Sequence, residues 1–133
     1  MTTETQSSEL EQGVEPHAVW VIPDALRELA QCGDTEILGE LIAIFCSDTA
    51  ARMGALNRAV ADGDTAAMRA QAHAIKGGAI QVGAIGMGQL CKEIELEGTN
   101  KSRAELAGML SRLQECFEQV SAAMAAHGGA SAE

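Results

Sequence analysis

The sequence is poor in aromatic residues, which make up 2% of its 133 residues and comprise one Trp, two Phe and no Tyr. Hydrophobic residues nevertheless reach 47% of the chain, so a core has to be built from Ala, Leu, Ile, Val and Met. These residues suit closely packed helices, whereas sheets favour β-branched and aromatic side chains. Composition therefore favours an all-α fold, and the length is that of one domain.

Positive charge is also scarce, with 9 Lys and Arg against 19 Asp and Glu and a net charge of −10. No Lys/Arg cluster offsets this charge locally, which argues against binding to nucleic acid or to anionic membrane surfaces. No apolar run approaches the roughly 20 residues that a membrane-spanning helix needs, and the N-terminus lacks the features of a secretion signal. We therefore expect a soluble, cytoplasmic protein that binds neither nucleic acid nor membrane.

Metal and disulfide chemistry has little support. The sequence has no CxxC pair, and without a secretion signal its cysteines are expected to be reduced thiols that pack as small apolar groups. His17 and His127 lie near the chain ends without metal-ligand spacing to His73, and the paired Glu-x-x-His motifs of a metal-binding bundle are absent. The cysteines are Cys32, Cys46, Cys91 and Cys116.

The chain divides into a central domain and two short ends. Residues 1–15 are polar and acidic, and we predict a flexible N-terminal tail. Residues 127–133 are rich in Gly, Ala and Ser, and we predict a flexible C-terminal tail. The domain between them, residues 16–126, contains helical segments separated by short turn signals, without an internal repeat.

The first two helices are predicted from their end signals. A short helix spans about residues 23–31, because Pro23 suits a first helical position and Gly33 suits the position just beyond the end. A longer helix follows Asp34, a plausible N-cap, and continues to about residue 61.

Three further helices follow. The Asp62-Gly63-Asp64 break ends the second helix, and Asp64 is placed to cap the third. Gly83 separates the third helix from a fourth, which ends near Gly98. The last helix covers about residues 102–126 and has the clearest apolar periodicity.

Apolar residues recur at helical spacing in the second to fifth helices, so each is expected to turn one face to a common core. Short connections between long helices imply antiparallel neighbours. We therefore predict an up-down antiparallel four-helix bundle with a short additional N-terminal helix. The predicted core positions are Ile37, Leu41, Phe45, Met53, Leu56 and Val60; Met68, Ala72, Ile75, Ala79 and Val82; Met87, Leu90 and Ile94; and Leu106, Leu110, Leu113, Phe117, Val120 and Met124.

His73 directly follows a core position of the third helix, so it points about 100° away from the core in a helix of 3.6 residues per turn. Arg69, one turn before it, and Lys76, Gly77 and Ile80 after it share this face. A neutral imidazole is a good nucleophile near neutral pH. Phosphoryl transfer needs little beyond in-line positioning and neutralisation of charge, which Lys76 and Arg69 are placed to supply.

Gly77 and Gly78 lie together inside the predicted third helix, where each costs roughly 0.8–1.0 kcal/mol relative to Ala. Close helix packing or a helix end at Gly77 would explain them structurally. Continuation of the apolar stripe through Ala79 and Val82 argues against an end there. The functional explanation is that Gly77, one turn from His73, leaves the imidazole uncovered so that another protein's active site closes over it.

A known motif matches this segment. The third helix resembles the phosphorylation motif of histidine phosphotransfer (HPt) domains through HAIKGGA at residues 73–79 and VGA at residues 82–84. The chain has no Walker-type glycine loop, so the phosphoryl group has to arrive on another protein. The resemblance covers roughly residues 22–124 and extends to Phe45, Asp48, Gly63-Asp64, Leu90-Cys91 and Ile94-Glu95.

The resemblance implies a phosphorelay carrier that is phosphorylated on Nε2 of His73 and exchanges the phosphoryl group with the aspartate of a receiver domain. Lys76 would assist the phosphoryl group and Gly77 would give access, with Arg69 and Gly78 in supporting positions. Such a chain has no kinase activity or ATP site of its own and binds no cofactor. Its partners are receiver domains of hybrid histidine kinases and response regulators, which carry Mg²⁺, and a monomeric, free-standing shuttle is expected.

Three questions stay open at this point. Relatives often place Gln where this chain has Glu95, so its carboxylate either accepts a hydrogen bond from Nδ1–H of His73 or is a solvated acid beside Glu93 and Glu97. Ile80 either belongs to a docking patch around His73 or packs against the N-terminal lead-in, which runs from Pro16 through Trp20 and Ile22 to the first helix. The alternative function is a helical adaptor that binds receiver or kinase domains without carrying phosphate, which a His73→Gln variant would distinguish.

Overall fold

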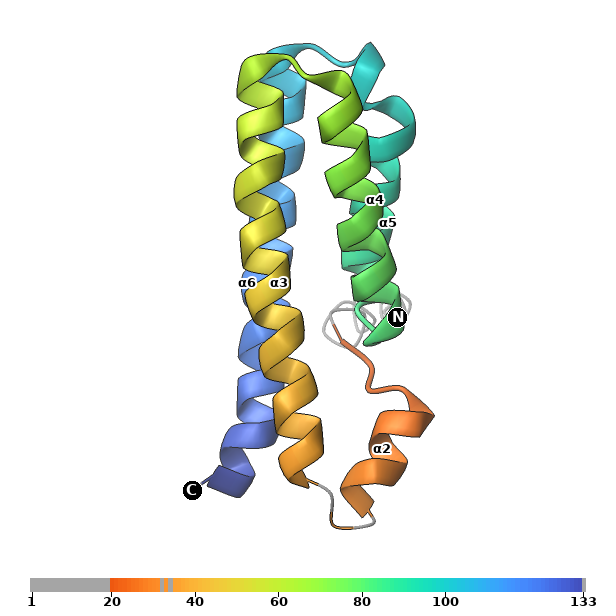
Figure 1. Ribbon diagram of the computed structural model, residues 1–133, viewed down its shortest axis with the longest axis vertical. Helices are drawn as coiled ribbons and strands as arrows, with labels where there is room; N and C mark the ends of the chain where they lie inside the picture. Colours follow the sequence, from red (N-terminus) through yellow and green to blue (C-terminus); the bar gives the residue numbers. More distant parts are fainter. Residues whose placement is uncertain (1–19, 32, 34, 133) are drawn as a thin grey trace, which may run out of the picture.

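The computed structural model describes residues 20–31, 33 and 35–132, and this part of the chain is helical without strands (Figure 1). The predicted all-α class is confirmed, whereas the predicted tail at residues 1–15 and the thiol of Cys32 lie outside the described residues. The elements are α2 (Asp24–Gln31), α3 (Thr35–Asp62), α4 (Thr65–Gln81), α5 (Ile85–Glu97), the short 3₁₀ helix η1 (Gly98–Asn100) and α6 (Arg103–Ala132).

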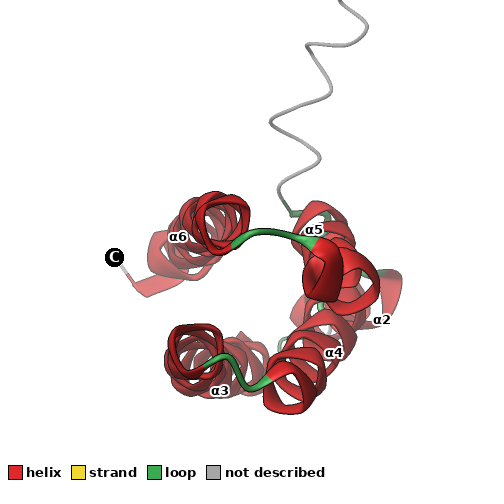
Figure 2. Ribbon diagram, turned by 90° about the horizontal axis from the view of Figure 1, so that it is seen from above, coloured by secondary structure: helices red, strands yellow, loops and turns green. Residues whose placement is uncertain are grey.

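Helices α3 to α6 form an up-down four-helix bundle, as the sequence predicts, and lie around a common centre when seen from above (Figure 2). Helices α3 and α6 have 28 and 30 residues, whereas α4 and α5 have 17 and 13. The long pair therefore extends beyond the short pair at one end of the bundle (Figure 1). The additional helix α2 lies at this end and packs against α3.

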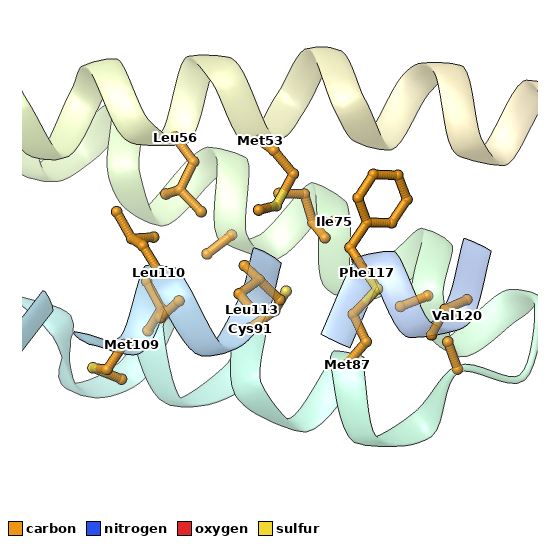
Figure 3. Packing of buried hydrophobic residues seen from close by; sticks show 14 of the residues in the cluster. Met53, Leu56, Ile75, Met87, Cys91, Met109, Leu110, Leu113, Phe117 and Val120 are labelled. Carbon is orange, nitrogen blue, oxygen red and sulfur yellow. The ribbon is translucent and has the colours of Figure 1, made fainter. Parts of the chain in front are cut away.

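The core lies between these four helices and is built from aliphatic side chains, methionines and two phenylalanines (Figure 3). Phe45 and Phe117 meet edge to face with ring centroids 6.3 Å apart, an arrangement that aromatic pairs prefer. The predicted stripes of α4, α5 and α6 are confirmed, although Val82 and Leu90 are only partly buried. The buried stripe residues of these helices are Met68, Ala72, Ile75, Ala79, Met87, Ile94, Leu106, Leu110, Leu113, Phe117, Val120 and Met124.

The predicted stripe of α3 is wrong at its beginning. Ile37 and Leu41 are 43% and 39% exposed, and Leu38 is the buried residue instead. Each four-residue step rotates about 40° beyond a full turn, so Ile37 lies about 80° from Phe45 around the helix, whereas Leu38 lies within about 20° of it. The predicted positions Phe45, Met53 and Leu56 are buried, and Val60 is partly buried.

The predicted helix ends agree with the structure to within about one residue except at the C-terminus, whereas the predicted N-cap Asp34 lies outside the described residues. The backbone N–H of Ala67 donates to the Asp64 carboxylate at 3.1 Å, which confirms the predicted N-cap of α4. Helix α6 continues to Ala132, so its predicted end at Ala126 is too early. Alanine has the highest helix propensity, and the alanines of this segment outweigh Gly128 and Gly129. Among the described residues, no helix is long and apolar enough to cross a membrane.

Candidate functional site

Helix α4 carries the predicted site and is continuous from Thr65 to Gln81, so no helix end occurs at Gly77. It ends in a turn in which Gly83 has a φ of 92°, a conformation that favours glycine. A Cβ on Gly83 would lie 1.9 Å from the carbonyl oxygen of Val21, so side chains are excluded here sterically as well. The indole N–H of Trp20 donates to the carbonyl of Val82 at 2.7 Å and holds the lead-in against the end of α4.

The centre of the site is a hydrogen-bonded group of three side chains from α4 and α5. Nδ1 of His73 lies 2.9 Å from Oε2 of Glu95, and Nζ of Lys76 donates to Oε1 of the same carboxylate at 2.9 Å. The side chain of His73 is 66% exposed, whereas that of Glu95 is 18% exposed. The carboxylate is therefore held between α4 and α5, and the imidazole projects outward from it.

The charge on Glu95 determines which ring nitrogen is free. The hydrogen bond from Lys76 lowers the pKa of Glu95, and the one from His73 lowers it further, although partial burial opposes both. Glu95 is therefore ionised at neutral pH and can only accept hydrogen bonds. We accordingly assign the proton of the neutral ring to Nδ1, which leaves the lone pair on Nε2, the nitrogen that faces solvent.

The consecutive glycines are not required by packing within the chain. A Cβ on Gly77 would meet no heavy atom within 4 Å, and one on Gly78 would meet only the Phe45 ring at 3.9 Å, an ordinary contact. Alanine would fit at both positions, and each glycine costs about 1 kcal/mol of helix stability relative to Ala. Close helix packing is thus excluded as their explanation, and Gly77 leaves open space one turn from His73.

The remaining predicted site residues lie apart from the hydrogen-bonded group. Arg69 is exposed and makes no hydrogen bond or ion pair with any described residue. Ile80 is half exposed, and its Cγ1 would lie 2.9 Å from a Cβ on Gly88, so it packs over α5. The docking role of Ile80 therefore stays a prediction.

Sequence reasoning missed an apolar groove beside the site. It has a volume of about 480 Å³ and lies where α2, α3 and the end of α4 meet. Ile44, which is 64% exposed, and Leu41 contribute apolar surface, and Gly78 lines the groove on α4, five residues after His73. The sequence signal is a second apolar row on α3, but the apolar periodicity assigns two of its residues, Ile37 and Leu41, to the core stripe. The lining residues are Leu26, Leu41, Ile44, Phe45, Asp48, Gly78, Gln81 and Val82.

The described thiols offer no alternative chemistry. Cys91 is fully buried, and burial raises its pKa to about 12, so it stays a protonated thiol that packs as an apolar group. Burial also raises the pKa of Cys116, and Cys46 lies 3.8 Å from the hydroxyl of Ser121. Within the described ranges, no group of three His, Cys, Asp or Glu side chains is placed to hold a metal ion.

Comparison with known families shows to which family the chain belongs. The family model of the Hpt domain matches residues 40–123, more than half of the chain. The chain belongs to the Hpt domain family. It is therefore a histidine phosphotransfer module of a phosphorelay, and Hpt proteins are phosphocarriers that interact with receiver domains of response regulators.

A solved structure agrees with this assignment at the level of the fold. The crystal structure of histidine-containing phosphotransfer protein B (HptB) from Pseudomonas aeruginosa PAO1 matches with a TM-score of 0.70 and 23% sequence identity. The match covers 81% of this chain and 94% of HptB. Comparison of the sequence with curated proteins gives no significant match.

The lowered pKa of Glu95 predicts how its contribution to stability depends on pH. Because the folded state lowers this pKa, the contribution is complete above the pKa of the unfolded state and is lost as the pH falls through the folded value. Replacing Glu95 with Gln should therefore lower the free energy of unfolding by about 0.5 kcal/mol at neutral pH. The difference should shrink once the pH falls below about 4. Urea unfolding of both proteins at several pH values measures it, and a difference that grows toward acid pH would contradict the assignment.

Proposed function

We propose that His73 accepts a phosphoryl group on Nε2 from the aspartate of one receiver domain and passes it to another. The observation that carries this proposal is the geometry at His73: Nδ1 is occupied by Glu95 at 2.9 Å, while the ring is 66% exposed. The protein would act as a carrier without kinase activity of its own. We further propose that it acts as a monomer in the cytoplasm, where an ATP-dependent kinase supplies the relay.

The transfer step needs no cofactor on this chain. The Nε2 lone pair attacks phosphorus in line with the P–O bond of the donor's aspartyl phosphate, the N–P bond forms, and the released carboxylate keeps the electron pair. The reverse sequence discharges the phosphoryl group onto the next receiver. In this proposal Mg²⁺ belongs to the receiver, where it neutralises the phosphoryl oxygens during transfer.

Three neighbours of His73 support this role. Lys76 lies one turn away and carries a positive charge that would attract the phosphoryl oxygens once they arrive beside it. Arg69 is exposed on the preceding turn and adds to the same positive field. Gly77 leaves the space through which the receiver's active site would close over the imidazole.

The apolar groove is the proposed docking surface for the receiver. Leu41 and Ile44 line the groove and continue an exposed apolar row on α3 that begins at Ile37, and isolated proteins rarely leave such rows uncovered without a binding function. Gly78 lines the groove five residues after His73, a rise of about 7.5 Å along α4, so a partner of domain size seated there would also reach His73. This surface is also the one an adaptor would use, so transfer rather than binding has to test the carrier role.

The first test is phosphoryl transfer from phosphorylated receiver domains in the presence of Mg²⁺, with a panel of receivers as donors. We expect acid-labile, alkali-stable label on the wild type and none on His73→Gln, because Gln has no nucleophilic ring nitrogen. Circular dichroism checks that both proteins are folded, and a binding assay checks that both dock. Docking of the wild type without label from any donor would contradict the carrier role and support the adaptor.

Substitution of Gly77 should change stability and the rate of phosphoryl transfer in opposite directions. Replacing it with Ala should stabilise the fold by about 0.8 kcal/mol, because the new Cβ meets no atom of the chain. The same methyl group should slow transfer to and from receivers, because it occupies space that the partner needs. Gly108→Ala on α6 is the matched control, since its Cβ also meets nothing, and it should raise stability without slowing transfer. Equal transfer rates for the two variants would argue against the access role.

Ile44 tests the docking surface. Replacing it with Ser should weaken receiver binding about tenfold, since an Ile side chain buried in an interface contributes about 1.5 kcal/mol. Leu96→Ser is the matched control, because Leu96 is 60% exposed and lies on α5 outside the groove. Isothermal titration with a receiver domain measures both affinities. Unchanged binding by Ile44→Ser would place the interface elsewhere.

A further inference from the structure

We propose that Glu95 keeps a proton on Nδ1 of His73 while the phosphoryl group is attached to Nε2, so that the group is carried as a phosphoimidazolium that discharges rapidly. This inference rests on the proposed function, because it concerns the phosphorylated form of the same histidine. Glu95 acts here as a positioning residue, since it contacts the ring nitrogen opposite the reacting one.

The hydrogen bond between Glu95 and Nδ1 of His73 favours a protonated Nδ1. Glu95 is held from two sides, by Lys76 at Oε1 and by His73 at Oε2, both at 2.9 Å. Its side chain is only 18% exposed, so water competes little for the carboxylate. The oxygen beside Nδ1 therefore stays a charged acceptor, and charged acceptors form stronger hydrogen bonds than neutral ones.

Proton balance shows what such an acceptor does. When Nε2 attacks phosphorus, the ring gains a substituent and loses nothing, so the immediate product is an imidazolium that still carries its Nδ1 proton. If this proton stays, breaking the N–P bond returns the electron pair to Nε2 and regenerates the starting neutral ring. The phosphoryl group then enters and leaves without any proton transfer at Nδ1.

Loss of the Nδ1 proton would convert the phosphorylated ring into a neutral phosphoimidazole. A neutral phosphoimidazole has a bare lone pair on Nδ1, which would face the Glu95 carboxylate at 2.9 Å with no hydrogen between two acceptors. Its discharge would release an imidazolide anion, a poor leaving group, unless a proton returned first. Gln at this position would tolerate both forms, because its amide can turn either its oxygen or its NH₂ group toward Nδ1.

No other described carboxylate competes for the ring. Lys76 is engaged by Glu95, and the charged pair on the neighbouring helix α3 is satisfied internally, with Arg52 bonded to Asp48 at 2.9 Å. The charged side chains within one turn of His73 and of Glu95 along their own helices are Arg69 and Lys76 on α4, and Lys92, Glu93 and Glu97 on α5. Among the described residues, the Glu95 carboxylate is the acidic group that contacts the ring, at 2.9 Å from Nδ1, so it is the group that favours protonation there.

The test compares wild type, Glu95→Gln and Glu93→Gln after loading with phosphoramidate, a small-molecule phosphoryl donor that needs no receiver. Glu93 lies on the same helix, is exposed and makes no hydrogen bond to His73, so its variant matches the change in charge. We expect spontaneous loss of label in buffer to be about fivefold slower for Glu95→Gln. Nitrogen-15 NMR should show protonated Nδ1 in the phosphorylated wild type and in Glu93→Gln, and unprotonated Nδ1 in Glu95→Gln at mildly alkaline pH.

Each result bears on one claim. Wild-type rates of loss and a protonated Nδ1 in Glu95→Gln would overturn the inference while leaving the carrier role intact. Failure of Glu95→Gln to load under conditions that load the wild type would also overturn it, because the inference predicts a longer-lived product. Absence of label on the wild type itself would instead contradict the proposed function.

Discussion

The geometry of the site depends on one carboxylate that joins α4 to α5. Glu95 accepts hydrogen bonds from His73 and Lys76, which lie on consecutive turns of α4. The neighbouring core residues Ile75 and Ile94 are almost fully buried, so packing sets the register that brings these polar groups together. A shift of either helix by one turn would break both hydrogen bonds while leaving an apolar core. The packing of α4 against α5 therefore positions the polar groups of the site.

Other features near the site lower the stability of the isolated chain. Gly77 and Gly78 weaken α4 where alanines would fit, and Ile44 leaves an apolar side chain in water. None of these three residues improves packing within the chain. Binding of another protein would explain all three residues, because a docking receiver needs open space near His73 and an apolar surface to contact. Membership of the Hpt family gives the identity of such a partner as a class.

Much of the fold and part of the site could be predicted from the sequence, because helix capping and apolar periodicity depend on residues close together in the chain. Asp64 is a short acidic residue directly before a helix, and it caps α4 as such residues commonly do. The segment HAIKGGA at residues 73–79 predicts an exposed histidine beside glycines. The sequence leaves the hydrogen bond of Glu95 open, because periodicity places a residue on a face without fixing where its carboxylate points. Ile37 was misplaced because successive four-residue steps drift around the helix. The groove forms only where three helices meet, which no local pattern encodes.

The central claim is that Nε2 of His73 is the atom that carries phosphate. The most direct measurement is phosphorus–nitrogen coupling by NMR, on protein labelled with ¹⁵N in its histidine rings and loaded from a phosphorylated receiver. The account predicts one-bond coupling from phosphorus to Nε2 of His73, assigned by its disappearance in a His73→Gln variant. Coupling to Nδ1, or a phosphorus signal that persists in that variant, would contradict it.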